Sequence, residues 1–305
     1  MRTTFIETLC KIAAQDERIW LLTADLGYSV VECFAHQFSE RFVNTGVAEQ
    51  NMTGIAAGLA MSGKIIFTYS IANFPVVRCL EQIRNDICYH NLNVKIVAVG
   101  GGMAYGGAGY THHALEDLAI MRVMPNMVVI APGDPVETKL ALKAITRHTG
   151  PCYLRLGMNN EPVIHKEEPH FEIGKAIQIK EGEDVIFIST GPILNTIVQT
   201  ADVLTRKGFS IGVYSMPTIH PIDQKAIIFA TTKAKCIISV EEHGPGGLGS
   251  AISEVLASVQ VKTKFVSMHT NPSLIHLVGS QEYLLQRNEL SVRAIVQKTL
   301  SILDH

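Results

Sequence analysis

Short apolar runs alternate with segments of helical periodicity through the first half of the chain. The runs lie at residues 19–22, 64–68, 94–99, 127–131 and 152–156. Between them, apolar residues recur at a spacing of three or four, as Phe5, Ile6 and Leu9 do near the start. This alternation predicts helices packed on a mostly parallel sheet.

A polar, proline-marked stretch interrupts this pattern near the middle of the chain. It contains Asn159-Asn160-Glu161-Pro162 and Lys166-Glu167-Glu168-Pro169, which have the composition of a connection between domains. From Val185 the alternation of strand-like and helical segments resumes. We therefore predict two three-layer α/β domains, a larger one at residues 1–160 and a smaller one at 183–305, with a linker at 161–182.

Composition and charge exclude several classes of protein. The 305 residues are 47% hydrophobic, enough for two buried cores. The net charge is −2 and basic residues are spread along the chain, so neither nucleic acid nor an anionic membrane surface is an expected partner. The N-terminus lacks an apolar signal core, and no apolar stretch approaches the roughly 20 residues that span a bilayer. We expect a soluble cytoplasmic protein.

The six cysteines are scattered and form no C-x-x-C pair. Isolated cysteines in apolar surroundings are typical of buried, reduced thiols. The sequence therefore predicts no metal site built from them.

Glu49 is the first candidate for chemistry. A predicted strand at 41–43 is followed by Asn44-Thr45-Gly46, and apolar residues then recur at helical spacing from Met52 onward. Glu49 is thus expected in a first helical turn beyond the carboxyl end of a strand, where open α/β sheets bind ligands. An acidic residue there also complements the helix macrodipole, so the position alone leaves both roles open.

His112 ends a glycine-rich loop that follows another predicted strand. The loop runs from Gly100 to Gly109, is too rich in glycine for a helix, and permits close approach of its backbone to a ligand. Thr111-His112-His113 then precedes a helical pattern that includes Leu115 and Leu118. A histidine in this place is a candidate for proton transfer, although a lone histidine is often structural.

Two glycine patterns resemble phosphate-binding motifs without matching them. Gly244-Pro245-Gly246-Gly247-Leu248-Gly249 follows a strand and precedes a helix but matches neither the dinucleotide fingerprint nor the P-loop, and we interpret it as a structural turn. In Gly133-Asp134-Pro135 the proline fixes φ where the magnesium and diphosphate motif of thiamine enzymes has glycine. We interpret Asp134 as a helix N-cap, with Pro135 as the first helical residue.

Five short motifs resemble the C-terminal section of transketolases when they are taken in order along the chain. They are Thr23-Ala24-Asp25-Leu26, Gly46-Val47-Ala48-Glu49-Gln50-Asn51-Met52, Glu81-Gln82-Ile83-Arg84-Asn85, Thr111-His112-His113, and Glu241-Glu242-His243 with Gly246-Gly247-Leu248-Gly249. The resemblance extends over a pyrimidine-binding domain and a transketolase C-terminal domain. It is nearest to split transketolases made of two subunits.

The resemblance implies that the enzyme uses thiamine diphosphate. A family glutamate that matches Glu49 hydrogen-bonds the aminopyrimidine ring of this cofactor. Because burial raises the pKa of a carboxyl group, such a glutamate can share a proton with the ring and activate the cofactor. Cleavage of a ketose and transfer of a two-carbon ketol unit to an aldose would follow, with the cofactor carrying the chemistry.

Further cofactor contacts follow from the same resemblance. Phe74 aligns with the aromatic residue that packs on the aminopyrimidine ring. Ile71 takes the place of a second aromatic residue, which predicts a more aliphatic ring pocket. Asp25 matches a family aspartate at the end of the first strand, with an expected role at an interface.

The substrate contacts are carried over in the same way. His112 aligns with a histidine that contacts substrate oxygens near the reacting carbon. Arg2 and Ser29 align with residues that hold the terminal phosphate of the sugar. Glu49 and His112 are thus the predicted catalytic residues, and Arg2, Ser29, His112 and Arg155 are the predicted substrate-binding residues.

The sequence also departs from the family at three substrate-contact positions. Ala108 replaces an acidic residue that grips a donor hydroxyl, and Gly100 replaces a phosphate-contacting histidine. The family's phosphate-clamping arginine falls at Met158, which leaves Arg155 as a candidate substitute. Losing a bidentate anion clamp is not conservative, so the usual sugar-phosphate substrates are in doubt.

The resemblance also predicts a partner. Nothing in the chain is expected to bind the diphosphate or a metal, so Mg²⁺ or Ca²⁺ would lie on a separate N-terminal transketolase subunit. We expect an α2β2 assembly that buries the cofactor at interfaces. The chain should be inactive alone.

Two alternatives remain open from the sequence. One is another thiamine enzyme with the same two-domain half, such as the β subunit of a 2-oxo acid dehydrogenase or an enzyme like deoxyxylulose phosphate synthase that uses pyruvate. The other is a non-catalytic scaffold or regulatory subunit. Thr111-His112 before a helix favours transketolase over the dehydrogenase, and retention of Glu49 speaks against a silent subunit.

Overall fold

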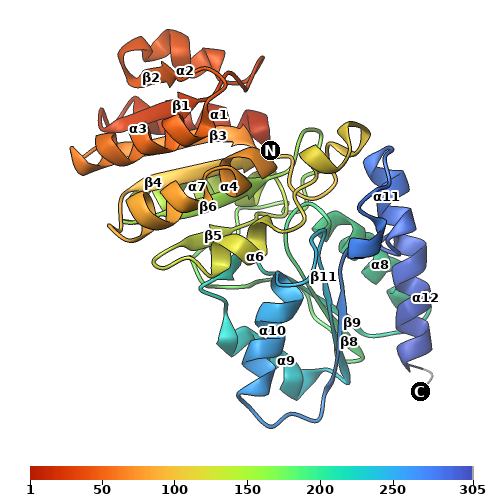
Figure 1. Ribbon diagram of the computed structural model, residues 1–305. Helices are drawn as coiled ribbons and strands as arrows, with labels where there is room; N and C mark the ends of the chain where they lie inside the picture. The colour runs from red at the N-terminus through yellow and green to blue at the C-terminus, as the bar shows by residue number, and fades with distance from the viewer. Residues whose placement is uncertain (304–305) are drawn as a thin grey trace.

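A seven-stranded sheet organises the first half of the chain in the computed structural model, which describes residues 1–303 (Figure 1). Its strand order is β10-β5-β6-β4-β3-β1-β2, and every neighbouring pair is parallel except β10 with β5. The strands are β1 (Ile19–Thr23), β2 (Phe42–Asn44), β3 (Ile65–Ile71), β4 (Val94–Val99), β5 (Val128–Ile130), β6 (Cys152–Leu156) and β10 (Thr218–His220).

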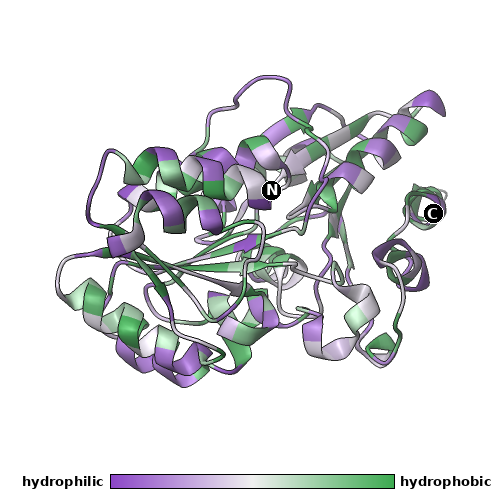
Figure 2. Ribbon diagram, turned by 90° about the horizontal axis from the view of Figure 1, so that it is seen from above, coloured by the Kyte–Doolittle hydropathy of each residue, from purple (hydrophilic) through white to green (hydrophobic). Residues whose placement is uncertain are grey.

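Helices cover both faces of this sheet. One face carries α1 (Arg2–Ala13), α2 (Glu32–Gln37) and α7 (Pro135–Arg147). The other carries α3 (Glu49–Met61), α4 (Asn73–Val77), α5 (Leu80–Gln82), the π-helical turn Ile83–Cys88 and α6 (Asp117–Arg122). The strands are mostly apolar, whereas the helices mix hydrophobic and hydrophilic residues (Figure 2), as expected for a parallel sheet buried on both faces.

Asp134 fixes both the start of α7 and the connection that follows the first domain. Its Oδ1 accepts the backbone N–H of Glu137 at 2.7 Å, with Pro135 as the first helical residue, so the predicted N-cap is confirmed. Its Oδ2 accepts the N–H groups of Ile164 and His165 at 2.9 and 3.0 Å. The connecting chain is thereby held against the first domain.

A five-stranded sheet with order β12-β11-β8-β9-β7 forms the second half. Its strands are β7 (Ile177–Lys180), β8 (Val185–Ser189), β9 (Ile211–Ser215), β11 (Cys236–Val240) and β12 (Lys264–Met268). Only β7 is antiparallel to its neighbour, and it is formed by residues that the sequence placed in the linker. One face carries α8 (Leu194–Arg206) and α12 (Val292–Leu303), and the other carries α9 (Gln224–Lys233) and α10 (Leu248–Ala257), while α11 (Gln281–Arg287) reaches the first domain. The predicted α/β class is confirmed.

Strand β10 carries the second half of the chain back to the first sheet. Thr218 and His220 pair with Ile130 and Val129 of β5, a contact that no sequence pattern indicated. Beside it, one apolar cluster runs without interruption from α3 and α6 of the first domain to α9 and α10 of the second. The two domains therefore share part of their core.

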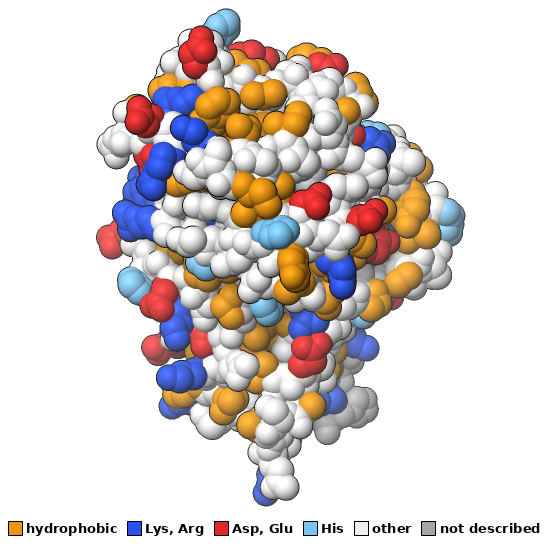
Figure 3. Space-filling model, turned by 60° about the vertical axis from the view of Figure 1, so that its left-hand side comes forward, with side chains coloured by type: hydrophobic (Ala, Val, Ile, Leu, Met, Phe, Trp, Pro, Cys, Tyr) orange, Lys and Arg blue, Asp and Glu red, His pale blue; other side chains and the backbone are white. Residues whose placement is uncertain are grey.

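The distribution of charged side chains on the surface agrees with the near-neutral net charge. Acidic and basic side chains both occur over the face drawn in Figure 3, together with small groups of hydrophobic side chains, as is normal for globular proteins. No helix within the described residues has the length and apolarity to cross a membrane.

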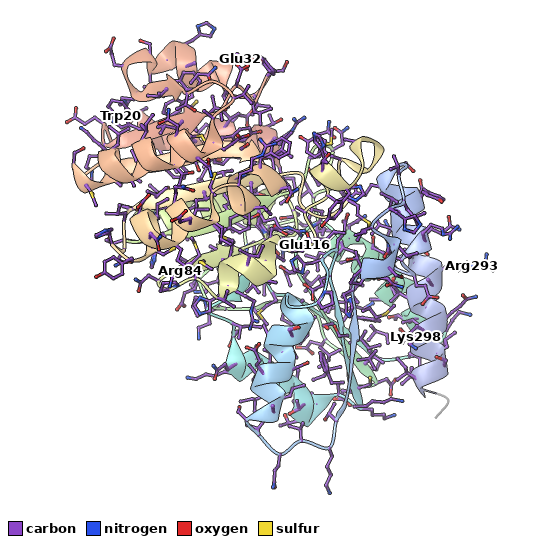
Figure 4. All side chains as sticks on the ribbon, viewed as in Figure 1. Trp20, Glu32, Arg84, Glu116, Arg293 and Lys298 are labelled. Carbon is purple, nitrogen blue, oxygen red and sulfur yellow. The ribbon has the colours of Figure 1, made fainter. Side chains whose placement is uncertain are left out.

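A buried ion pair of the first domain lies at the junction with the second. Arg155 on β6 donates from Nε to Oδ2 of Asp117, the first residue of α6, at 2.8 Å, and Tyr153 donates to the same oxygen at 2.6 Å. Arg155 Nη2 also donates to the carbonyl oxygens of Ala114 and Glu242, at 2.8 and 3.0 Å. Figure 4 labels Glu116, immediately before α6, where the two domains meet.

His243 of the second domain caps α6 of the first. Its Nδ1 lies 2.7 Å from the carbonyl oxygen of Gly244, and its Nε2 lies 3.1 Å from the backbone nitrogen of Leu118. This network assigns the proton to Nδ1, so that Nε2 accepts from the helix N–H. Burial lowers the pKa of His243 to about 4, and the ring is neutral at pH 7.

Glu241 caps the next helix in the same region. Its two carboxylate oxygens accept the N–H groups of Leu248 and Gly249 at the start of α10, at 2.7 and 2.8 Å. Burial raises the pKa of Glu241 to about 7, although both hydrogen bonds favour the charged form. Two side chains at the junction therefore have shifted pKa values, with that of Glu241 raised and that of His243 lowered.

The two pKa shifts predict opposite pH dependences of the free energy of unfolding. Glu241 binds its proton more tightly in the folded state, so its stabilisation is full below about pH 4.5 and is lost as pH rises through 7. His243 binds its proton less tightly when folded, so its stabilisation is present above about pH 6.5 and is lost as pH falls through 4. Relative to wild type, Glu241→Gln should become more stable as pH rises from 4.5 to 7, by at most about 1.4 kcal/mol per pH unit, and His243→Asn should do the reverse.

Urea unfolding followed by circular dichroism at a series of pH values measures both slopes. The exposed Glu7→Gln substitution on α1 is the matched control, because Glu7 lies away from the junction. Curves for both junction variants that run parallel to wild type would contradict the assignment.

Candidate active site

The carboxyl ends of β1, β2, β3 and β4 lie at the same end of the first sheet, and this end is called the site edge below. From β1 the sheet grows in two directions, with β2 on one side and β3 on the other. A ligand site is expected where the order of an open sheet reverses in this way, outside the carboxyl ends of the strands. The loops that leave β1, β2, β3 and β4 all converge there, and they carry most of the residues singled out from the sequence.

Glu49 lies at this edge as the first residue of α3. Its residue exposure is only 4%, so its carboxylate is largely withdrawn from water. Within the described residues its side-chain partner is Arg78, whose Nη1 lies 3.0 Å from Oε1. Arg78 itself is half exposed, with 50% of its side-chain surface open to solvent.

The guanidinium of Arg78 also lies on the ring of Phe74. Its Cζ is 4.2 Å from the ring centroid, a cation–π distance. A planar cation thus stacks on Phe74 while it donates to Glu49. We did not single out Arg78 from the sequence, although its helical spacing from Phe74 and its charge opposite to Glu49 are a signal that could have found it.

His112 also lies against Phe74. The two rings meet edge to face with centroids 5.2 Å apart, and the Tyr105 ring is 6.1 Å from His112. Thr111 Oγ1 lies 3.0 Å from His112 Nδ1, and its carbonyl accepts from Asn73 Nδ2 at 3.0 Å. His112 ends a short 3-10 turn, Tyr110–His112, and α6 begins only at Asp117, so the helix starts later than the sequence indicated.

Arg2 and Ile71 line a small cavity next to this row of side chains. Tyr69 of β3 and Tyr105 of the glycine-rich loop line it too. The cavity joins the N-terminus of α1 to the end of β3. Sequence reasoning missed both tyrosines, because only the packing of the loop against β3 shows that they face Arg2.

Asp25 and Ser29 lie in the loop after β1, at the rim of the site. Both have left-handed backbone conformations, with φ of 55° and 62°, which non-glycine residues seldom adopt. Asp25 is held by Asn44, which accepts from its backbone N–H at 2.9 Å, and the N–H of Ser29 donates to Glu32 at 2.7 Å. Asp25 and Ser29 are thus fixed in place, although neither touches Glu49.

Arg155 does not belong to this group. We expected it as a substitute phosphate clamp, but it is only 3% exposed and its Nε and Nη2 are used by Asp117, Ala114 and Glu242 at the domain junction. Withdrawing it for a ligand would leave Asp117 buried without its cation. The structure therefore gives Arg155 a structural position, which corrects the expectation.

Neither glycine pattern offers a phosphate site. At Gly244–Gly249 the helix N–H groups that would bind an anion are taken by Glu241. Asp134 is fully buried and spends both oxygens on backbone N–H groups. Within residues 1–303, no three His, Cys, Asp or Glu side chains are grouped so that they could hold a metal ion.

Comparison with known proteins places these features in a family. Residues 1–162 match the profile of the transketolase pyrimidine-binding domain, and residues 174–289 match that of the transketolase C-terminal domain. A Methanocaldococcus jannaschii protein named for the transketolase C-terminal section is 40% identical over 305 residues, covering 98% of this chain and 95% of the relative. An apulose-4-phosphate transketolase subunit from Phocaeicola vulgatus is 37% identical, covering 88% of this chain and 86% of the relative.

A solved structure is also similar to this chain along nearly its whole length. It is described as a split gene transketolase, inactive β4 tetramer, and it superposes with a TM-score of 0.89 at 36% identity, covering 99% of this chain and 97% of the other. A 1-deoxy-D-xylulose-5-phosphate synthase of Desulfitobacterium hafniense is also 34% identical over 83% of this chain, although the match spans only 40% of that enzyme. The chain therefore belongs to the transketolase family and corresponds to the C-terminal subunit of its split, two-chain members.

Proposed function

We propose that this chain is the C-terminal subunit of a thiamine-diphosphate-dependent transketolase, which transfers a two-carbon ketol unit from a ketose to an aldose. The buried Glu49 carboxylate beside the Phe74 ring, at the point where the sheet order reverses, carries this proposal. Thiamine diphosphate, when bound, would supply the chemistry of carbon–carbon cleavage and ketol transfer. The remaining steps depend on residues of the two subunits.

The geometry around Glu49 fits an aminopyrimidine ring. Such a ring is flat, stacks on aromatic side chains and hydrogen-bonds a carboxylate through a ring nitrogen. The Arg78 guanidinium is also flat, stacks on Phe74 at 4.2 Å and donates to Glu49 at 3.0 Å. Arg78 thus uses both contacts that the cofactor ring needs, and it has to move aside when the ring enters.

Each of the predicted residues is then assigned a role. Glu49 holds the proton that it shares with the ring nitrogen, in a position shielded from water. Phe74 and Ile71 form the walls on which the ring packs. His112, edge to face with Phe74, is placed to contact substrate oxygens and to move a proton near the reacting carbon.

The cofactor's diphosphate and its metal are assigned to a second subunit. The Asp134 carboxylate that could have suggested a diphosphate motif is a buried N-cap. We propose that an N-terminal transketolase subunit binds the diphosphate through Mg²⁺ or Ca²⁺, and that two copies of each chain form an α2β2 assembly with Asp25 near an interface. The split-gene relative described as an inactive β4 tetramer supports both self-association of this kind of subunit and its inactivity alone.

Parallel assays of the reconstituted complex with two kinds of substrate test the proposed reaction. A ketose with an aldose acceptor should give ketol transfer, and pyruvate should give no carbon dioxide. Release of carbon dioxide from pyruvate without ketose cleavage would assign the chain to the pyruvate-using class, to which the deoxyxylulose phosphate synthase match also points. Absence of both reactions in a complex that binds cofactor would favour the non-catalytic alternative.

Glu49→Gln should abolish turnover without preventing assembly. The amide is nearly isosteric but cannot share a proton with the ring, and loss of a general acid–base group typically costs about 10²- to 10⁴-fold in rate. Ketol transfer and sedimentation of the complex are measured together, with the exposed Glu7→Gln as control. Activity close to wild type in an assembled E49Q complex would refute the catalytic role.

Arg78→Met should tighten cofactor binding to the assembled complex. The substitution removes the side chain that competes for Glu49 and Phe74, an interaction of about 1 kcal/mol, which corresponds to a roughly fivefold lower dissociation constant. Calorimetric titration of the cofactor-free complex measures it. Arg84→Met, a neighbouring exposed arginine whose side chain bonds only to Asn85, is the control, and weaker binding in R78M than in R84M would show that Arg78 helps to hold the cofactor.

A further inference from the structure

A small cavity lies beside the candidate active site and is not lined by Glu49, Phe74 or His112. It has a volume of about 180 Å³, and the side chains that give it its character are Arg2, Tyr28, Tyr69, Ser70, Ile71 and Tyr105. Arg2 comes from the first turn of α1, Tyr69 and Ser70 from the end of β3, and Tyr105 from the loop after β4. With the loop after β1, which carries Tyr28, four separate segments thus line one space.

Two polar atoms at the cavity have no hydrogen-bond partner among the described residues. Arg2 Nε and Ser70 Oγ are both buried without a hydrogen bond to any described residue. Burial raises the pKa of both Tyr69 and Tyr105, and the nearby Arg2 guanidinium offsets part of each rise, so both hydroxyl groups face that cation. Unsatisfied buried donors are costly, and no Asp or Glu is among the residues that line the cavity.

Gly100 shows why Tyr105 can occupy this place. A Cβ atom at position 100 would lie 2.1 Å from Cε2 of Tyr105, and the backbone there has φ of +77°. A side chain at position 100 and the ring of Tyr105 therefore exclude one another. The resemblance had marked the absence of a histidine at this position as the loss of a phosphate contact, and the ring of Tyr105 fills the space that such a side chain would need.

We propose that Tyr105 is a specificity-determining residue, whose hydroxyl group joins Arg2 in binding an oxyanion at the far end of the sugar substrate. A phosphate or sulfonate group matches a cavity that offers a guanidinium and several hydroxyl donors and no carboxylate. The ring of Tyr105 also lies 6.1 Å from that of His112, so one side chain connects the reacting end of the site with its far end. The inference rests on the proposed ketol transfer and names the class of substrate.

Tyr105→Phe tests this with the complex of both subunits. The ring and its packing against Gly100 are kept while the hydroxyl group is lost. With a phosphorylated ketose donor such as fructose 6-phosphate, kcat/KM should fall about tenfold, mainly through KM, as expected for one hydrogen bond to a charged group. With erythrulose, which has no phosphate, kcat/KM should be unchanged. Tyr110→Phe, in the same loop but half exposed, is the matched control and should alter neither donor.

The two donors separate a specificity role from other roles. An equal loss with both donors would place Tyr105 in packing or in support of His112, and no loss with either would show that its hydroxyl group binds nothing. Each result would overturn the proposal.

Inorganic phosphate gives a readout that does not need turnover. Millimolar phosphate should raise the melting temperature of the isolated wild-type chain relative to chloride at equal ionic strength, and the rise should be lost in Arg2→Gln and reduced in Tyr105→Phe. If the complex cleaves no ketose but this phosphate effect is present, the ketol-transfer function fails while the oxyanion site stands. A wild-type melting temperature that does not respond to phosphate, in a complex that uses both donors equally well, would overturn the site itself.

Discussion

The ion pair between Arg155 and Asp117 is the contact on which the arrangement of the site depends. It joins β6 to the first residue of α6, and the second nitrogen of the same guanidinium reaches the carbonyl oxygens of Ala114 and Glu242. Ala114 lies two residues beyond His112, so the loop that carries His112 is fastened to both domains at once. Breaking one partner of such a buried pair typically costs about 3–5 kcal/mol, far more than an exposed pair contributes. The position of His112 is therefore a property of the domain junction as much as of its own loop.

Most of the strands could be predicted because the sheets are parallel and covered on both faces. Runs such as 94–99 and 152–156 are apolar at nearly every position, and the structure places strands over the same residues. The two strands that escaped prediction are the antiparallel edge strands. Thr218–His220 is three residues long and lies between prolines, so only its pairing with β5 makes it a strand. Long-range pairing of this kind leaves no local pattern to read.

The candidate site shows the same division between local and distant information. Glu49 was identified because a strand, a turn and a helix start follow one another within a few residues, and the ordered motifs gave that position a chemical meaning. Arg155 was misjudged because alignment by position says nothing about burial, and a buried arginine held by Asp117 cannot serve a ligand. Arg78 and Tyr105 were missed for a related reason. The pairing of Arg78 with Glu49 and the approach of Tyr105 to Arg2 join segments far apart in the sequence, and only the helical spacing of Arg78 from Phe74 was visible beforehand.

The different exposures of Glu49 and Arg78 determine how readily Glu49 exchanges one hydrogen-bond partner for another. A pair in which the arginine keeps half of its side-chain surface in water contributes about 1 kcal/mol or less, so Arg78 is easily displaced. The carboxylate is in the opposite position, because at 4% exposure it cannot be left without a partner when the proposed second subunit closes over it. In the proposed assembly, closure of that interface would therefore require a replacement for Arg78 at the same moment. The proposed cofactor ring, hydrogen-bonded to Glu49 and packed on Phe74, would meet this requirement and would tie cofactor binding to assembly through a single carboxylate.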